Sequence, residues 1–315
     1  MKALINGEWH GDLGADPGLL RQFRSAPKHA FRSWITTDGA SGFRAEPNRY
    51  HLYVSYACPW ANRTILYRKL KGLEGVISMS VLHPRWAGAD GWWFAETPYS
   101  TRDHVACCET LYQVYQRAQP DFTGKVTVPV LWDRKDGAIV SNESGDIIRM
   151  LNSSFDQWAD ASVDFYPKDR RDEIEALNDL VLPKVSMGVY RAGFAGSQES
   201  YDNAVRDLFE ALDILEDRLA TRIFLLGDRV VETDWHLFMT LVRFDAVYNT
   251  ALKCSIRRLI DFPALSAYTR RLYELPGVAE TIKLDHVKMH YFDDLGIGNP
   301  RVVPAGPARD FRNAA

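Results

Sequence analysis

One stretch, "HLYVSYACPWANRTILYRKLKG" from His51 to Gly72, constrains the fold more than any other part of the chain. Its opening residues, "HLYVS", are rich in β-branched and aromatic side chains, which is typical of a strand. Pro59 then follows Cys58, and a proline in the first turn of a helix loses no hydrogen bond. The stretch therefore predicts a strand, a tight connection, and a helix that runs from Cys58 to Lys71.

The alternation of strands and helices continues to about residue 152. We predict a strand at "GVISMSV", a helix at about 101–118, a hairpin from "TVPVLWD" and "GAIVS", and a short helix at "NESGDIIRMLN". Residues 83–100 contain three tryptophans and form a loop whose length is typical of a functional segment. This order predicts an α/β domain in which helices cover both faces of a sheet.

The remainder of the chain is predicted to be helical. Over 203–220 the apolar residues recur at helical spacing, as Val205, Leu208, Phe209, Leu212, Leu215 and Leu219. The segments 171–190, 234–251 and 263–274 are also expected to be helices. We therefore expect an all-helical domain over 168–292, preceded by a linker that contains Tyr166 and Pro167. Residues 1–50 and 293–315 are rich in Gly and Pro, so we expect an extended N-terminal arm and an extended C-terminal tail.

Composition excludes several classes of function. Hydrophobic residues make up 46% of the chain and aromatic residues 12%, which is enough to bury a large core. The formal net charge is -3 and the sequence has no basic stripe, so nucleic acid is not an expected partner. No apolar run approaches the roughly 20 residues that span a membrane. The first residues lack the apolar core of a secretion signal, which favours the cytoplasm.

The position of Cys58 indicates a reactive thiol. A cysteine at the start of a helix lies at the positive end of the helix dipole, which stabilises a thiolate. The thiolate is the nucleophilic form of cysteine, so this position favours covalent catalysis. The alternative interpretation is a buried cysteine with a purely structural role.

Cys58 has no partner cysteine one helical turn away, because Ala61 stands at that position. Cys107, Cys108 and Cys254 lie in other predicted elements and are poor candidates for an internal disulfide with Cys58. The sulfur that Cys58 bonds must therefore come from outside the chain. A lone cysteine suits a mixed disulfide with a small thiol, which a second thiol molecule later removes.

Two later segments indicate which thiol would bind. A cis peptide between Val128 and Pro129 would turn the Val128 backbone toward the cysteine, so that it could pair with a bound peptide. Glu143 and Ser144 open a predicted helix, whose free N–H groups attract a carboxylate. Ser144 could add a hydroxyl hydrogen bond, and Glu143 could pair with an ammonium group. A carboxylate beside an ammonium group is the amino-acid end of a γ-glutamyl group.

With these residues in view, the chain resembles the glutathione transferases, and more closely the glutathionyl-hydroquinone reductases, or Xi class. The resemblance covers about residues 19–307. It rests on stretches that include "FRSWI", "AEPNRYHLYVSYACPWANR", "GWWF", "TVPVLWD", "IVSNESGDIIRMLN", "GVYRAGFAGSQESYDNAV", "LVRFDAVY" and "PGVAETIKLDHVKMHY". It implies a thioredoxin-like α/β domain over 51–155 followed by an all-α domain of the glutathione-transferase type over 168–292.

The resemblance also implies an activity and roles for individual residues. Cys58 would be the nucleophile, and Tyr190 and Tyr291 would contact the hydroxyl groups of a hydroquinone. The residues implied to hold glutathione are Trp92, Lys125, Val128, Glu143 and Ser144. The chain would reduce glutathionyl-hydroquinones through a mixed disulfide of Cys58 with glutathione, releasing oxidised glutathione. Relatives of this class pair into homodimers, so a homodimer is expected.

Two positions depart from the pattern of this class. Asn62 stands where many relatives have histidine, and Val231 stands where relatives usually have a threonine that caps a helix. Glu232, Thr233 or Asp234 would then provide the cap. His286 and His290 have the spacing of a metal pair on a helix, but no third ligand is evident and no metal is expected.

Two other functions are compatible with the same cysteine. An omega-like thiol transferase or dehydroascorbate reductase would share Cys58 and the glutathione site and differ in its acceptor. The tryptophan-rich loop and the two tyrosine motifs favour the hydroquinone reductase over this alternative. A non-catalytic glutathione-binding protein, or ligandin, would not need a reactive cysteine, so alkylation of Cys58 as a function of pH would separate the two classes.

Overall fold

The computed structural model describes residues 1–26, 31–294 and 302–312. The chain divides into two compact units, Met1–Ala161 and Ser162–Ala315. The division falls inside the linker expected from the sequence. The predicted bounds of the two domains, 51–155 and 168–292, stay a prediction.

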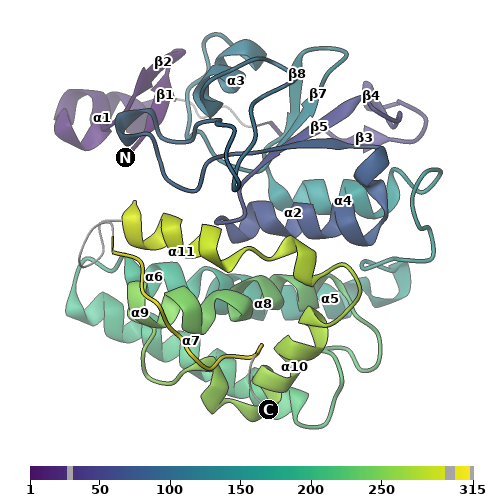
Figure 1. Ribbon diagram of the computed structural model, residues 1–315, viewed down its shortest axis with the longest axis vertical. Coiled ribbons are helices and arrows are strands. Elements are labelled where there is room, and N and C mark those ends of the chain that lie inside the picture. Colours follow the sequence, from purple (N-terminus) through teal and green to yellow (C-terminus); the bar gives the residue numbers. More distant parts are fainter. Residues whose placement is uncertain (27–30, 295–301, 313–315) are drawn as a thin grey trace. The chain divides into compact units, whose positions relative to one another are not determined.

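The first unit is built on a four-stranded mixed sheet in the order β6-β5-β7-β8 (Figure 1). Strands β5 (Tyr50–Val54) and β6 (Ser78–Val81) are parallel. Strand β7 (Val130–Asp133) is antiparallel to β5 and to β8 (Ala138–Ser141). All five residues of β5 are buried. The predicted strand at 51–55 and the predicted hairpin are therefore confirmed.

Helices cover both faces of this sheet (Figure 1). Helix α2 (Pro59–Leu70) packs against α4 (Ser144–Ser153) on one face. Helix α3 (Leu111–Ala118) lies on the other face and contacts β8. The α/β architecture expected from the alternating pattern is thus confirmed, with Cys58 at the end of the central connection between β5 and α2.

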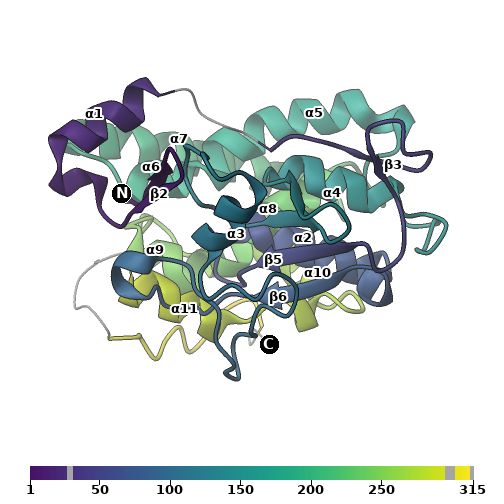
Figure 2. The ribbon, with the colours of Figure 1, turned by 90° about the horizontal axis from the view of Figure 1, so that it is seen from above.

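The first 50 residues contain more regular structure than the extended arm that we expected. They form the hairpin β1 (Ala3–Ile5) and β2 (Glu8–His10), helix α1 (Pro17–Ser25), and the short pair β3 (Ile35–Thr36) and β4 (Phe43–Arg44). Helix α1 lies beside the β1–β2 hairpin (Figure 2), and Phe23 joins Ala3 and Ile5 in a small apolar cluster. The side chain of Asp16 accepts hydrogen bonds from Gly18 and Leu19 and so fixes the start of α1.

The helix expected at about 101–118 starts only at Leu111. The preceding residues wrap around the carboxylate of Asp103, which accepts hydrogen bonds from the backbone N–H groups of Val105, Ala106 and Cys108. These bonds replace the helical pattern. The side chain of Gln113 then accepts the backbone N–H of Thr110 at 3.1 Å and closes the first turn of α3.

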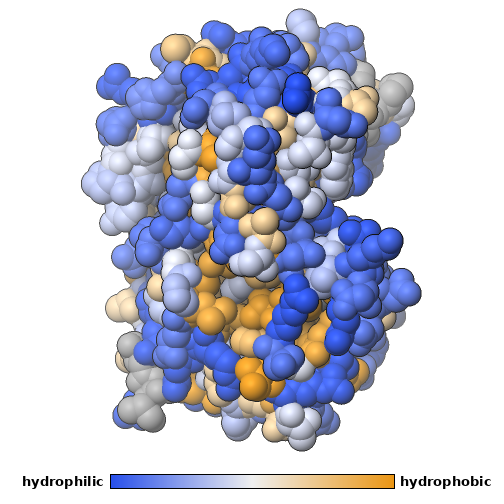
Figure 3. Space-filling view, turned by 90° about the vertical axis from the view of Figure 1, so that its right-hand side faces the viewer, coloured by the Kyte–Doolittle hydropathy of each residue, from blue (hydrophilic) through white to orange (hydrophobic). Residues whose placement is uncertain are grey.

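Over its described residues the second unit contains helices and no β-strand. Its main helices are α5 (Arg171–Leu180), α6 (Gly188–Gly193), α7 (Gln198–Leu219), α8 (Glu232–Arg243), α9 (Asn249–Ala251), α10 (Pro263–Tyr273) and α11 (Leu284–Asp293). Contacts join α7 to α6 and to α10, and α8 to α5 and to α10. On the face in Figure 3, apolar side chains gather in this helical unit. The expected helices at 203–220 and 263–274 are confirmed.

Two predicted helices are interrupted by π-helical turns. The segment 171–190 contains the π-helix Val181–Ser186, and 234–251 contains the π-helix Phe244–Tyr248. Pro183 lies within the first of them, and a proline inside a helix cannot donate its backbone hydrogen bond. Such π-turns are frequently found at functional sites.

The C-terminal segment was expected to be extended from 293 onward. Helix α11 ends at Asp293, and residues 295–301 and 313–315 of the predicted tail lie outside the described residues. Residues 302–312 contain no helix or strand. The ring of Phe311 is buried against Tyr273, and the guanidinium of Arg270 donates to the Phe311 carbonyl oxygen at 2.8 Å. No helix within the described parts of the chain is long and apolar enough to cross a membrane.

Candidate active site

Cys58 is the residue immediately before α2 and is half-buried. Its backbone is extended (φ -78°, ψ 118°), and its carbonyl oxygen accepts the backbone N–H of Asn62 at 2.8 Å. The thiol is therefore held at the N-terminal end of the helix, where the first amide groups have no partner inside the helix. This position matches the one predicted from the sequence.

Val128 lies beside this thiol. The peptide bond between Val128 and Pro129 is cis, as predicted. The thiol of Cys58 donates to the Val128 carbonyl oxygen at 3.8 Å, which joins two residues that are 70 positions apart. The preceding residue is fixed as well, because the hydroxyl group of Tyr115 donates to the Thr127 carbonyl oxygen at 2.8 Å.

Glu143 and Ser144 form the start of α4, as predicted. Glu143 is the exposed N-cap residue and Ser144 is the buried first residue of the helix. The hydroxyl oxygen of Ser144 accepts a hydrogen bond of 2.6 Å from the guanidinium of Arg63, a residue of α2. Sequence reasoning missed Arg63, because the contact depends on the packing of α2 against α4.

The other two residues expected to bind glutathione lie in loops of the same unit. Trp92 follows the 3-10 turn Gly88–Asp90, and its carbonyl oxygen accepts the backbone N–H of Leu111 at 2.9 Å. Its ring packs edge-on against Trp86. Lys125 is exposed in the loop before β7. The structure thus joins Cys58 to Val128 and Ser144 to Arg63, and it shows no corresponding contact for Lys125 within the described residues.

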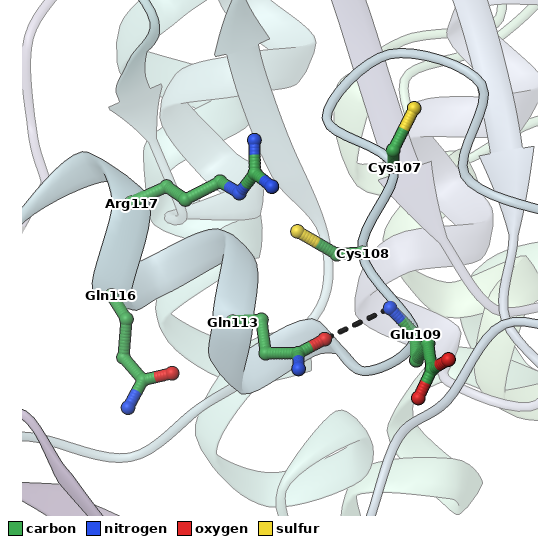
Figure 4. A pocket seen from close by; sticks show the side chains of 6 residues that line it. All are labelled: Cys107, Cys108, Glu109, Gln113, Gln116 and Arg117. Carbon is green, nitrogen blue, oxygen red and sulfur yellow. Dashed lines mark hydrogen bonds between the residues drawn. The ribbon is translucent and has the colours of Figure 1, made fainter.

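The remaining cysteines differ from Cys58 in their surroundings. Burial raises the pKa of Cys254 to about 12 and the pKa of Cys108 to about 11, so both stay protonated at neutral pH. Cys107 is exposed. A cavity of about 450 Å³ is lined by Cys107, Cys108, Glu109, Gln113, Gln116 and Arg117. Figure 4 shows the two adjacent thiols pointing in different directions.

Tyr190 and Tyr291 belong to the second unit, where they meet. Their hydroxyl oxygens lie 2.5 Å apart, although the residues come from α6 and α11. Burial raises the pKa of Tyr291 well above its usual value, so its phenol stays protonated. Tyr248 adds a third hydroxyl group, 3.4 Å from that of Tyr190 and 3.5 Å from that of Tyr291. Sequence reasoning did not identify Tyr248 as part of this tyrosine cluster.

Of the two departures from the class pattern, Asn62 lies four residues after Cys58 in α2, and Val231 lies at the start of α8. Asn62 is fully buried in α2. At the start of α8, Val231 provides no side-chain cap, and the Asp234 carboxylate accepts the Val231 backbone N–H at 2.8 Å. His290 pairs with Asp294 at 2.9 Å. Among residues 1–26, 31–294 and 302–312, no group of three potential metal ligands is assembled.

Models of known protein families match parts of both units. The model of the glutathione S-transferase N-terminal domain matches residues 57–154, and that of the C-terminal domain matches residues 198–271. The first match contains Cys58, Val128, Glu143 and Ser144.

Individual relatives are similar over nearly the whole chain. The glutathionyl-hydroquinone reductase YqjG of Escherichia coli is 46% identical over 99% of this chain and 97% of its own length. The glutathionyl-hydroquinone reductase PcpF of Sphingobium chlorophenolicum is 46% identical over 85% of this chain and 86% of its own.

Solved structures agree with the sequence comparison. The glutathione-bound structure of YqjG superimposes with a TM-score of 0.89 at 45% identity, covering 98% of this chain and 96% of the other. A Xi-class glutathione transferase from Natrialba magadii gives a TM-score of 0.92 at 45% identity, covering 100% of this chain and 96% of the other. The chain therefore belongs to the glutathione transferase family, in the Xi class of glutathionyl-hydroquinone reductases.

Proposed function

We propose that this chain is an enzyme that uses glutathione to reduce glutathionyl-hydroquinones to hydroquinones. The observation that carries the proposal is the Cys58 thiol at the start of α2, directed at the backbone of a cis Val128–Pro129 peptide. The names of the relatives YqjG and PcpF support the choice of substrate.

The glutathione contacts are part of this proposal. The Val128 backbone would pair with the peptide of glutathione, as in strand addition. The amide groups and the Ser144 hydroxyl at the start of α4 would hold the γ-glutamyl carboxylate, and Glu143 would accept the ammonium group. Trp92 would cover the tripeptide, and Lys125 would contribute a further contact.

The reaction would proceed in two steps, each of them an attack of a thiolate on a sulfur atom. In the first, the Cys58 thiolate attacks the sulfur of the glutathionyl-hydroquinone. An S–S bond forms, the C–S bond to the ring breaks, and the hydroquinone leaves with the electron pair and takes up a proton. In the second, a glutathione thiolate attacks the mixed disulfide, which gives oxidised glutathione and restores Cys58. The net change is the reduction of the substrate by glutathione.

The aryl carbon is a poor leaving group, and a keto tautomer of the hydroquinone would accept the departing electrons. We propose that Tyr190 and Tyr291 bind the hydroquinone hydroxyl groups and handle the associated protons. Both side chains can stack on a ring and donate or accept a hydrogen bond. The 2.5 Å contact between their hydroxyl groups supports a shared role.

The direct test is glutathione-dependent turnover of glutathionyl-menadiol by the wild type and by Cys58→Ser. We expect release of menadiol by the wild type, and a loss of about 10³-fold or more in the variant because a serine hydroxyl is a much weaker nucleophile at neutral pH. An inactive wild type that reduces dehydroascorbate or a mixed disulfide would instead establish the omega-like alternative. Glutathione binding without either activity would establish a ligandin.

The tyrosine assignment has its own test. Tyr190→Phe and Tyr291→Phe each remove one hydroxyl group and keep the ring, so we expect kcat to fall by roughly 10²-fold, the usual size of a lost proton-transfer group. Phe209→Tyr is not a suitable control, because it would place a hydroxyl group in the buried apolar part of the same unit. Tyr273→Phe removes a hydroxyl group from α10 and serves instead. Unchanged turnover in both test variants would refute the assignment.

We also propose that the chain acts in the cytoplasm as a homodimer, without a metal ion and without a nucleic-acid or membrane partner. The proposal follows from the composition and from the class to which the chain belongs. Sedimentation of the purified chain would test the dimer.

A further inference from the structure

Arg63 is a charged residue inside the first unit that the proposed mechanism does not use. It lies in α2, and only 5% of its surface is exposed. Its guanidinium donates a 2.6 Å hydrogen bond to the hydroxyl oxygen of Ser144, which is 81 residues away and 3% exposed. The guanidinium also lies over the ring of Trp60, 5.0 Å from its centroid. Both neighbours fix the position of this charge.

This hydrogen bond determines the direction of the Ser144 hydroxyl. A guanidinium only donates, whereas a hydroxyl group has one proton and two acceptor positions. Ser144 must therefore accept from Arg63, and its own proton is left for another acceptor. Because Ser144 is the first residue of α4, that proton lies at the helix end whose backbone amides also seek an acceptor.

Apart from Glu143, which is proposed to accept the ammonium group, the charges around this helix end favour an anion. The acidic residue in the first turn of α4 is Asp146. The Asp146 carboxylate pairs with Arg32 through two hydrogen bonds, one of them of 2.8 Å. This pairing reduces the repulsion between Asp146 and the carboxylate of a bound ligand. Arg63 supplies a buried positive charge next to Ser144, and buried charges are screened less by salt than exposed ones.

We propose that Arg63 is a positioning residue that gives the start of α4 its specificity for the carboxylate of the γ-glutamyl group. It would act through Ser144, by turning the hydroxyl proton toward the ligand, and through its own charge. The inference rests on the proposed function only in that Ser144 binds glutathione.

Binding measurements on the full chain test this role without turnover. In a Cys58→Ser background, which avoids mixed disulfides, calorimetry would compare glutathione with γ-aminobutyryl-cysteinyl-glycine, which lacks the carboxylate. We expect the Cys58→Ser protein with Arg63 intact to bind glutathione more tightly than the analogue. Adding Arg63→Gln should reduce the ratio of the two affinities by about tenfold or more, the usual effect of losing a charge-assisted hydrogen bond. Ser144→Ala should lose a similar factor, and the double variant should lose less than the product of the two.

Three controls separate positioning from general damage. Arg102→Gln removes an exposed charge from the same unit and should leave the preference unchanged. Glutaryl-cysteinyl-glycine, which lacks only the amino group, should lose affinity with Arg63→Gln as glutathione does. If Arg63→Gln fails to fold, Arg63→Lys decides, because a point charge without the planar fork should reduce the preference by about threefold.

The role would be overturned if Arg63→Gln, or Arg63→Lys in its place, weakened both ligands equally, since the residue would then only support the packing of α2 on α4. Unchanged binding of both ligands would overturn it as well. Failure of the proposed reductase activity would leave these binding differences intact, so the two failures are distinguishable.

Discussion

Helices α2 and α4 of the first unit begin differently from helices α7 and α8 of the second. Cys58 precedes α2, and its thiol is directed at the Val128 carbonyl oxygen rather than at the helix amides. At the start of α7, Ser197 and Ser200 satisfy each other's backbone N–H groups. At the start of α8, Asp234 accepts the backbone N–H of Val231, and the Phe165 carbonyl oxygen accepts the backbone N–H of Glu232, the first residue of the helix.

The two kinds of helix start serve different purposes, one ligand binding and the other folding stability. A capped helix start has its first amide groups satisfied by the protein, so it adds to folding stability and offers little to a ligand. A start without a side-chain cap keeps these amide groups for an anion such as a thiolate or a carboxylate. We infer that the first unit gives up helix caps at the positions where glutathione is proposed to bind.

The largest expected effect concerns thiol reactivity. We expect iodoacetamide at pH 8 to alkylate Cys58 and Cys107 at least about a hundredfold faster than Cys108 and Cys254, because burial raises the pKa values of the last two. The rate for Cys254 should keep rising about tenfold per pH unit until the pH approaches its pKa of about 12. Peptide mapping by mass spectrometry measures each rate.

Unfolding in urea provides the control for this comparison, since all four thiols should then react at similar rates. Alkylation of Cys254 as fast as that of Cys107 in the native chain would contradict the effect of burial.

The next effect concerns the cap of α8. The Asp234 carboxylate accepts hydrogen bonds from the backbone N–H groups of Val231 and Leu225 and from the Tyr268 hydroxyl. Asp234→Ala would leave the buried N–H groups of Val231 and Leu225 without this acceptor and would leave the Tyr268 hydroxyl only the longer 3.4 Å contact with the backbone carbonyl oxygen of residue 234. We therefore expect a loss of about 3 to 5 kcal/mol in the free energy of unfolding. Urea denaturation measures this loss.

Ser197→Ala at the exposed start of α7 is the matched variant. It removes one cap from a solvated helix end and should cost about 1 kcal/mol. Equal losses in the two variants would show that burial of the cap is unimportant.

The smallest effect is a gain at the start of α2. The extended backbone of Cys58 suits an N-cap, and serine is a favoured N-cap residue. Cys58→Ser should therefore be more stable than Cys58→Ala by about 0.5 to 1 kcal/mol, although both variants lose the nucleophile. Thermal and urea unfolding of the two variants would check this, and a more stable alanine variant would argue against an open helix start.

Much of the fold was predictable from local sequence. The β-branched strand before Cys58 and the proline after it specified β5 and α2. The errors arose where side chains overrode periodicity, as Asp103 did in the expected helix at 101–118. Helix α1 was missed although Asp16 and Pro17 are a recognisable start signal.

The candidate site was only partly predictable for a related reason. Cys58, Val128 and Ser144 each carry a local signal, namely a helix start or an X-Pro bond. Arg63 and Tyr248 carry none, because their roles come from tertiary contacts. Arg63 meets Ser144 across the α2–α4 packing, and Tyr248 meets residues from two other helices.

The most direct test of the central claim is a single turnover without free glutathione. Wild-type protein in excess would be mixed with glutathionyl-menadiol, and the products identified by chromatography and mass spectrometry. The proposed mechanism predicts one equivalent of menadiol and one glutathionyl group on Cys58, which added glutathione then removes as oxidised glutathione. Release of menadiol only after free glutathione is added, with Cys58 unmodified throughout, would contradict a mixed disulfide and the nucleophilic role of Cys58.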